Sequence, residues 1–114
     1  MNTNPLLWAI PALPLLGYLI TGPAGVVVGA GDVEAQARQV FALLGRALAA
    51  AGAGAGDVAK VTVFLLDIDD RPRINPVRQE FFGATRPAST LVQVSALAVP
   101  GALLEVEAVA HVPA

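Results

Sequence analysis

The sequence contains no cysteine and only one histidine. Without cysteine the chain can form no disulfide, offers no thiolate nucleophile and holds no cysteine-ligated metal. His111 has no second histidine with which to share an ion, and its place near the end of the sequence predicts a surface residue. We therefore expect no metal and no cofactor, and a reducing, cytoplasmic location is compatible with this composition.

Basic residues are also few. The chain carries seven Lys and Arg against nine Asp and Glu, which gives a formal charge of −2, and its sequence pI is about 5.1. A chain without a basic surface has little to attract a phosphate backbone, so nucleic acid is not an expected partner. The length of 114 residues predicts a single domain over residues 1–114, which can bury roughly two thirds of its unfolded surface.

Charge is absent from residues 1–31, where Pro5–Ile20 reads PLLWAIPALPLLGYLI. A membrane span is one interpretation of this run. However, the run is shorter than the ~20 residues that a spanning helix needs, it contains Pro11 and Pro14, and no Lys or Arg precedes it as in a signal peptide. We therefore expect no membrane association and favour short buried strands bounded by proline and glycine. The candidates are ALPLLG at residues 12–17 and GVVVGA at residues 25–30.

Periodic apolar residues predict a helix from about residue 33 to residue 51. Apolar side chains recur every three or four residues at Val33, Ala37, Val40, Phe41, Leu44 and Leu48. Asp32 is a suitable N-cap, and Gly52 is a suitable stop. We interpret the glycine clusters on either side of this helix as turns. Glu34 stands where a dinucleotide-binding loop needs its third glycine, and the second cluster follows a helix instead of a strand.

The second half of the chain predicts a strand, a helix and two further strands. The strand is DVAKVTVFLLDID, and the helix lies in DDRPRINPVRQEFFG. Asn75 can cap this helix with Pro76 at its first position, and Gly83 can end it. The last two strands, STLVQVSAL and ALLEVEAVAHV, are separated by AVPGA, so we expect them to pair as a hairpin.

The alternation in this hairpin predicts a sheet with both helices packed on one face. The face toward the helices is expected to carry Thr90, Val92, Val94 and Ala96 with Leu104, Val106, Ala108 and Ala110. The opposite face is expected to carry Leu91, Gln93 and Ser95 with Glu105, Glu107 and Val109. This places Glu105 near Ser89. The second face is too apolar for solvent, which predicts packing against another subunit.

Several sequence blocks, in this order, resemble the RidA/YjgF family, once labelled L-PSP endoribonucleases. They are GDVEAQARQVFALLGRALAAAG, VAKVTVFLLDIDD, FFG, RPAST and LLEVEAVA, and they cover about residues 29–112. Residues 1–28 match poorly. The resemblance implies a chorismate-mutase-like α+β fold with a mixed sheet, a homotrimer with ligand clefts between subunits, and hydrolysis of reactive imines and enamines.

The resemblance also implies site residues. In the family an arginine in a PARS-like motif clamps the substrate carboxylate, and here Ser89 stands at that position, followed by Thr90. The family's glutamate near the last strand, which positions water, corresponds to Glu105 as the catalytic residue. The family's asparagine on the second helix corresponds to Asn75. Leu91 takes the place of a Thr or Cys that lines the cleft.

The missing arginine predicts a cleft for a small molecule without a carboxylate. Two alternatives stay open. In one, Arg86 or backbone N–H groups supply the anion site and the chain is an imine deaminase; in the other, the trimer is a structural or interaction platform. Ser89 is a poor candidate for a nucleophile because His111 is the only imidazole. Tyr18 does not replace the tyrosine of the family by position.

Overall fold

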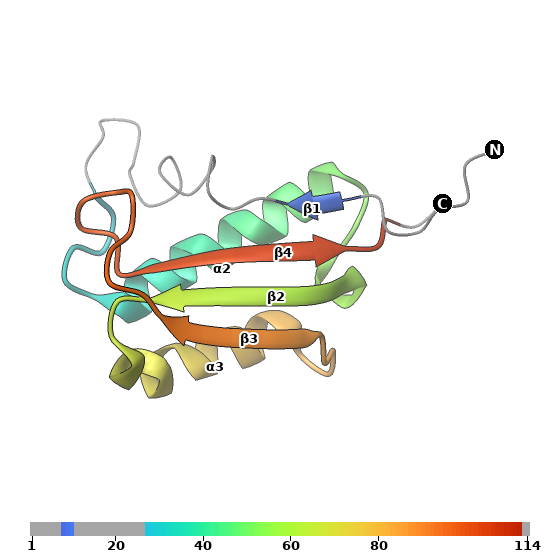
Figure 1. Ribbon diagram of the computed structural model, residues 1–114. Coiled ribbons are helices and arrows are strands. Elements are labelled where there is room, and N and C mark those ends of the chain that lie inside the picture. Colours follow the sequence, from blue (N-terminus) through green and yellow to red (C-terminus); the bar gives the residue numbers. More distant parts are fainter. Residues whose placement is uncertain (1–7, 11–26, 113–114) are drawn as a thin grey trace.

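The computed structural model of the chain describes residues 8–10 and 27–112. Its main elements are β1 (Trp8–Ile10), α2 (Val33–Ala50), β2 (Val58–Leu65), α3 (Arg71–Phe82), β3 (Ala88–Gln93) and β4 (Leu104–Ala110). Short 3₁₀ turns at Ala55–Asp57 and Ile68–Asp70 precede β2 and α3. The strands form one sheet in the order β1-β4-β2-β3 (Figure 1). No helix within the described ranges is long and apolar enough to cross a membrane.

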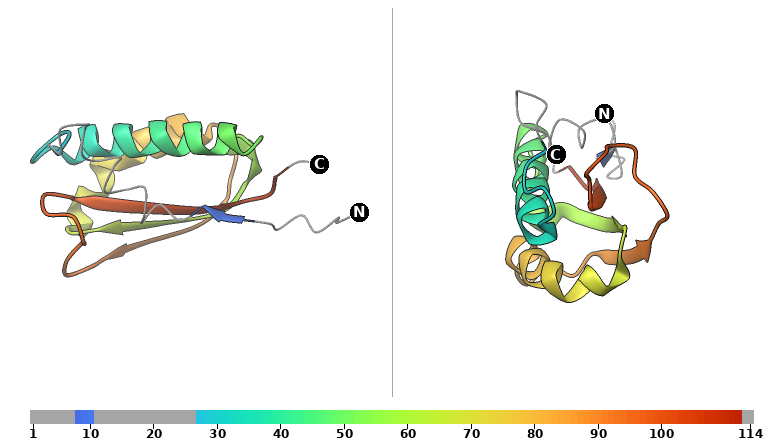
Figure 2. Two further views of the ribbon diagram at one scale, coloured as in Figure 1. Left: turned by 90° about the horizontal axis from the view of Figure 1, so that it is seen from above. Right: turned by 90° about the vertical axis from the view of Figure 1, so that its left-hand side faces the viewer.

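Both helices lie on one face of the sheet (Figure 2), so the predicted α+β architecture is confirmed. Between the layers lies the core, formed by Val33, Ala37, Val40, Phe41, Leu44 and Leu48 of α2, Ile74 and Val77 of α3, Val61, Val63 and Leu65 of β2, and Leu104, Val106 and Ala108 of β4. The apolar stripe predicted for α2 is therefore the face that the helix buries.

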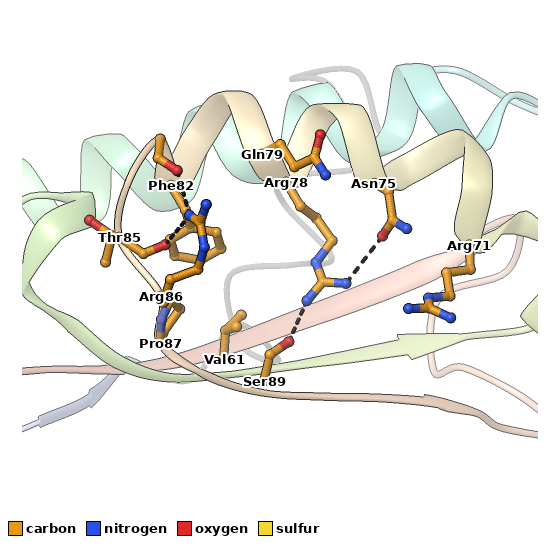
Figure 3. Close-up of a pocket in the computed structure, with 11 residues that line it drawn as sticks. Val61, Arg71, Asn75, Arg78, Gln79, Phe82, Thr85, Arg86, Pro87 and Ser89 are labelled. Atoms are coloured by element: carbon orange, nitrogen blue, oxygen red, sulfur yellow. Dashed lines mark hydrogen bonds between the residues drawn. The ribbon is translucent and has the colours of Figure 1, made fainter.

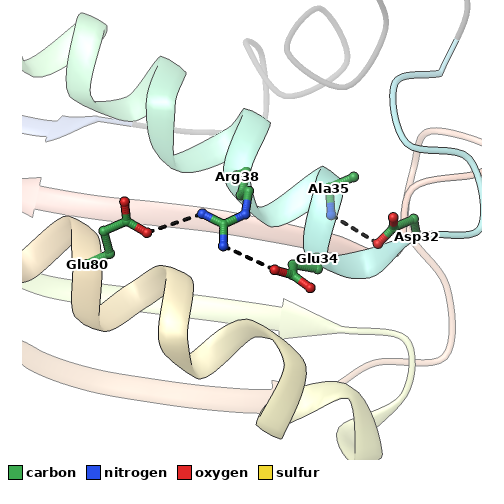
Figure 4. Close-up of polar contacts among 5 residues, drawn as sticks. All are labelled: Asp32, Glu34, Ala35, Arg38 and Glu80. Carbon is green, nitrogen blue, oxygen red and sulfur yellow. Dashed lines mark hydrogen bonds and ion pairs between the residues drawn. The ribbon is translucent and has the colours of Figure 1, made fainter.

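The ends of α2 are also as predicted. The side chain of Asp32 accepts a hydrogen bond from the backbone N–H of Ala35 at 3.1 Å (Figure 4), which confirms the N-cap. Gly52, just after the helix, has φ of 80°. Glycine reaches this left-handed conformation without the steric penalty of other residues, so it ends the helix.

The two helices contact each other through aromatic rings and an ion pair. The ring of Phe41 on α2 lies 5.2 Å from that of Phe81 and 6.1 Å from that of Phe82, measured between centroids. Arg38 bridges Glu34 on its own helix at 3.1 Å and Glu80 on α3 at 3.2 Å (Figure 4). These charged side chains are more than half exposed, so the ion pairs contribute little. The aromatic contacts therefore fix the position of α3, from which the pocket described below is built.

The second helix starts earlier than predicted. α3 begins at Arg71, so Asn75 and Pro76 lie inside the helix and not at its start. Pro72 is the proline in the first turn, where a missing N–H costs nothing, whereas Pro76 removes one internal hydrogen bond. The predicted end of the helix is confirmed, since Gly83 follows it with φ of 57°.

The predicted hairpin between the last two strands is wrong. β2 lies between β3 and β4, parallel to β3 and antiparallel to β4. A parallel pair needs a crossover connection, and α3 supplies it between β2 and β3. Residues 94–103 then cross the end of β2. There the N–H of Val94 donates to the carbonyl of Leu65 at 2.8 Å, and that of Leu66 to the carbonyl of Leu103 at 3.1 Å.

This pairing reverses the predicted faces of β3. In the parallel ladder Ser89 lies beside Val61, which belongs to the core. Ser89 and every second residue after it therefore lie on the helix side of the sheet, and Thr90 lies on the other side. Glu105 pairs with Phe64 on the side away from the helices, as predicted. Ser89 and Glu105 are thus on opposite faces of the sheet, and the contact predicted from a hairpin within one chain is wrong.

The N-terminal predictions are covered only in part. β1 pairs antiparallel with the end of β4. The candidate strand at residues 12–17 and Tyr18 lie outside the described residues. Of the candidate at residues 25–30, Val27 forms an isolated bridge and the residues after it form a turn. Gly29 has φ of 66° in this turn, so the interpretation of the first glycine cluster as a turn is confirmed.

Candidate functional site

A pocket of about 620 Å³ lies between α3 and the start of β3 (Figure 3). Its lining includes Val61 of β2, Arg71, Asn75, Arg78 and Phe82 of α3, Arg86 of the following turn and Ser89 of β3. It brings three guanidinium groups together with the amides of Asn75 and Gln79 and the hydroxyls of Thr85 and Ser89, and its described lining contains no carboxylate. Among the described residues, no three His, Cys, Asp or Glu side chains are placed to hold a metal ion.

Arg78 extends from α3 across this pocket to β3 (Figure 3). Its Nη2 donates to the hydroxyl of Ser89, and its Nη1 donates to Oδ1 of Asn75 at 3.4 Å. The side chain is half-buried, and its buried Nε has no partner among the described residues. Burial and the positive charge of Arg71 lower the pKa of Arg78 below its ordinary value. A guanidinium therefore stands at Ser89, where the resemblance to the family predicted that one was missing.

Arg86 is held differently. Its Nη1 donates to the carbonyls of Gly83 at 2.7 Å and Thr85 at 3.1 Å, so the side chain folds back on the turn after α3 (Figure 3). A cation beside carbonyls at the end of a helix is favourably placed. Arg86 lines the pocket, as is required by the alternative in which it supplies the anion site. Its guanidinium also stabilises the turn after α3.

The structure brings some of the predicted site residues together and separates others. Ser89, Asn75 and Arg86 line the same pocket. Leu91 lies in an adjoining cavity of about 450 Å³ that shares Ser89, Arg71 and Arg78 with the first. Thr90 belongs to the opposite face of the sheet because β3 pairs with β2. Glu105 is also on that face and does not line the pocket of its own chain.

Arg71 and Arg78 are the pocket residues that sequence reasoning missed. Together with Asn75 they are spaced by four and three residues, which puts all three on one face of a helix. The prediction that the helix starts at Asn75 hid this signal, because Arg71 would then lie before the helix and not on its face. With α3 starting at Arg71, the spacing alone places these polar groups side by side.

Glu105 is buried on the face away from the helices, with 5% of its surface exposed. Its partner across the ladder is Phe64, and Glu107 follows two residues later on the same face. Burial, with a smaller effect of the negative charge of Glu107, raises the pKa of Glu105 above its ordinary value. The carboxyl group is therefore easier to protonate in the folded chain than in the unfolded chain.

This difference predicts how stability depends on pH. A carboxyl group whose pKa is raised on folding binds its proton more tightly in the folded state, so the free energy of unfolding falls as pH rises through the window above the ordinary value of 4.5. We expect Glu105→Gln to lose this fall, so that the variant gains stability relative to wild type as pH rises. Urea denaturation from about pH 4 to pH 8 measures the difference. Parallel curves for the two proteins would contradict the prediction.

Comparisons with known proteins agree with this architecture. The family model described as Endoribonuclease L-PSP matches residues 18–112. A RutC family protein of Pyrococcus horikoshii is 38% identical over 97 residues, which are 85% of this chain and 76% of that protein. A 2-iminobutanoate/2-iminopropanoate deaminase of Bos taurus is 37% identical over 94 residues, 82% of this chain and 68% of that enzyme. The crystal structure of YyfA, a Rid family protein of Yersinia pestis, has a TM-score of 0.75 at 35% identity and covers 82% of this chain and 74% of that one.

Proposed function

Because the chain belongs to the endoribonuclease L-PSP family, which includes the RidA/YjgF proteins, we propose that it hydrolyses a small imine or enamine in the pocket between α3 and β3. In such a reaction water adds to the carbon of the C=N bond, the C–N bond then breaks, and the products are a ketone or aldehyde and ammonia. A similar protein is named for this reaction on 2-iminobutanoate and 2-iminopropanoate.

The observation that carries this proposal is the convergence of Ser89, Asn75 and Arg78 on one pocket. The expectation of a ligand without a carboxylate rested on the serine at position 89, which supplies no guanidinium to the cleft. Arg78 donates to the hydroxyl of that same residue, so the reason for expecting an uncharged ligand is removed. The geometry favours the alternative in which a deaminase uses another anion site, with Arg78 in place of Arg86.

The reaction also needs a group that orients or deprotonates water, and the described lining of the pocket contains no carboxylate. Glu105 is a candidate for this role, because it is a carboxyl group whose pKa is raised by burial, as is common for carboxyl groups that transfer protons in active sites. Since it lies on the other face of its own sheet, it can serve this chemistry only in a pocket completed by another subunit. We therefore include a homotrimer with clefts between subunits in the proposal. Exposed Thr90 and Val92 beside half-buried Phe64 make that face suitable for an interface.

A direct assay tests the proposed reaction. 2-Iminobutanoate is generated in situ by oxidation of 2-aminobutanoate with an amino-acid oxidase, and formation of 2-oxobutanoate is followed with and without the protein. We expect a rate of 2-oxobutanoate formation clearly above the spontaneous rate in buffer. The reason is that the pocket holds the substrate and a water molecule in a fixed relative position. Light scattering on the same sample gives the mass of the assembly.

The matched control is Arg46→Leu, which removes an exposed arginine of α2 outside the pocket. It should leave the rate unchanged, and this separates the chemistry of the pocket from a general effect of protein charge. A wild-type rate equal to the spontaneous rate would refute the hydrolase proposal. A monomeric mass would refute the part of it that assigns Glu105 to a neighbouring pocket.

A further inference from the structure

Arg71 and Arg78 are shared by two cavities. Both line the pocket beside Phe82 and Arg86, and both line the adjoining cavity beside Ile68 and Leu91. They are seven residues apart on α3, which corresponds to about two helical turns. Figure 3 shows that both side chains extend from the same side of the helix toward β3. Two guanidinium groups therefore lie where the two cavities adjoin, beside apolar side chains on the Leu91 side.

This pair of cations lacks the neighbours that usually neutralise such groups. Ion pairs within 4.0 Å among the described residues are the two that Arg38 makes, so neither Asp69 nor Asp70 neutralises Arg71. Arg71 also stands in the first turn of α3, at the positive end of the helix dipole, where a cation is unfavourable. Arg71 is thus held at an unfavourable end of the dipole and close enough to Arg78 to repel it, and no described carboxylate pairs with either.

The burial of Arg78 adds a second unfavourable contribution to the repulsion between the two guanidinium groups. A guanidinium has five N–H groups, and the described residues accept from one on Nη1 and one on Nη2. Its Nε is buried without a described partner. Leaving a buried donor unsatisfied is unfavourable, and for a charged group the penalty is larger. An anion placed between Arg71 and Arg78 would remove both the repulsion and part of the unmet hydrogen bonding.

We infer that Arg71, Arg78 and the hydroxyl of Ser89 bind the carboxylate of the ligand, so that the clamping guanidinium is supplied by α3 instead of β3. This inference rests on the proposed function and narrows its substrate to small 2-imino acids. The planar guanidinium of Arg78 matches the two oxygens of a carboxylate. The aliphatic part of the ligand then lies toward Leu91 and the exposed side chain of Ile68.

Binding measured apart from turnover tests the inference. Calorimetric titration compares 2-oxobutanoate, the stable keto acid, with 2-butanone, which has a similar aliphatic part without the carboxylate, and with inorganic phosphate. We expect 2-oxobutanoate to bind at least about 10-fold more tightly than either of the others. Arg78→Leu should weaken its binding by about 10–100-fold, and exposed Arg71→Leu by a smaller factor.

Arg78→Lys and Arg46→Leu are the matched variants. Lysine keeps the charge without the two-pronged geometry, so Arg78→Lys should recover only part of the affinity, and Arg46→Leu should bind as wild type does. Circular dichroism confirms folding, and Arg71→Leu keeps the test valid if Arg78→Leu does not fold. Unchanged binding in Arg71→Leu and in a folded Arg78 variant, equal binding of 2-butanone, or tighter binding of phosphate would each overturn the assignment. Arginine-dependent binding without turnover would instead refute the hydrolase and leave the carboxylate site standing.

Discussion

Replacing Gln36 with leucine is expected to lower the free energy of unfolding by about 2–4 kcal/mol, since it removes three hydrogen bonds and leaves the carbonyl of Gly101 and the N–H of Leu103 without a described partner. Gln36 is fully buried in α2. Its Nε2 donates to the carbonyls of Gly29 at 3.2 Å and Gly101 at 3.0 Å, and its Oε1 accepts from the N–H of Leu103 at 2.8 Å. One amide thus ties the turn before α2 to the segment that crosses from β3 to β4. Leucine fills a similar volume but satisfies none of these groups.

Thermal unfolding followed by circular dichroism measures this effect, with an expected decrease in Tm on the order of 10–25 °C. Gln39→Leu, one turn along the same helix and only half-buried, is the control. It changes the same side chain without breaking a described hydrogen bond, so its Tm should stay close to that of wild type. A Gln36→Leu variant as stable as the control would show that water or local rearrangement replaces the three hydrogen bonds.

The importance of Gln36 could not be read from the sequence, although α2 itself could. Positions such as Val40 and Leu44 repeat with helical period, and Asp32 marks the start, so the local signals agree with one another. Gln36 lies between apolar positions and looks like a surface residue. Its partners at residues 101 and 103 are 65 and 67 residues away in sequence. No local pattern predicts such a contact.

The order of the strands illustrates a different limit. AVPGA looks like the turn of a hairpin, and this suggested that the last two strands are neighbours. The ten-residue segment 94–103 is long enough to cross one strand, however, and the order strand, helix, strand before it is typical of a parallel pair. If the order strand, helix, strand had been given more weight than the turn, the prediction would have placed β2 between β3 and β4. It would also have put Ser89, beside Val61, on the helix side.

The candidate site could be predicted only in part, because the face of the sheet on which a residue lies depends on this strand order. The resemblance assigned Ser89 and Asn75 to one cleft, and both line one cavity of the structure. Those assignments follow the order of residues and need no knowledge of faces. Thr90 and Glu105 were assigned with them but belong to the opposite face, which depends on strand pairing. Arg78 was missed because its position in the sequence does not align with the arginine of the family, although its guanidinium contacts Ser89. A side chain on one element that lies beside a residue of another element can be recognised only when the packing of the two elements is known.

Moving the guanidinium from α3 to β3 is expected to preserve anion binding. Arg78→Ser alone should weaken binding of 2-oxobutanoate by about 10–100-fold, and the double variant Arg78→Ser with Ser89→Arg should return to within about threefold of wild type. The physical reason is that the two side chains are already in hydrogen-bonding contact, so either position can place a guanidinium in the same gap. Ser89→Arg alone should lower stability by about 1 kcal/mol without ligand, because it adds a like charge beside Arg78.

The control for this exchange is Arg78→Ser with Ser95→Arg. Ser95 is exposed beyond the end of β3, so this variant has the same net charge as the double variant but no guanidinium at position 78 or 89. It should bind as weakly as Arg78→Ser alone. Equal recovery in both double variants would mean that general attraction of an anion explains the binding. No recovery in a folded Arg78→Ser/Ser89→Arg protein would mean that the anion requires a donor on α3, next to Arg71 and Asn75, and that position 89 no longer belongs to the anion site.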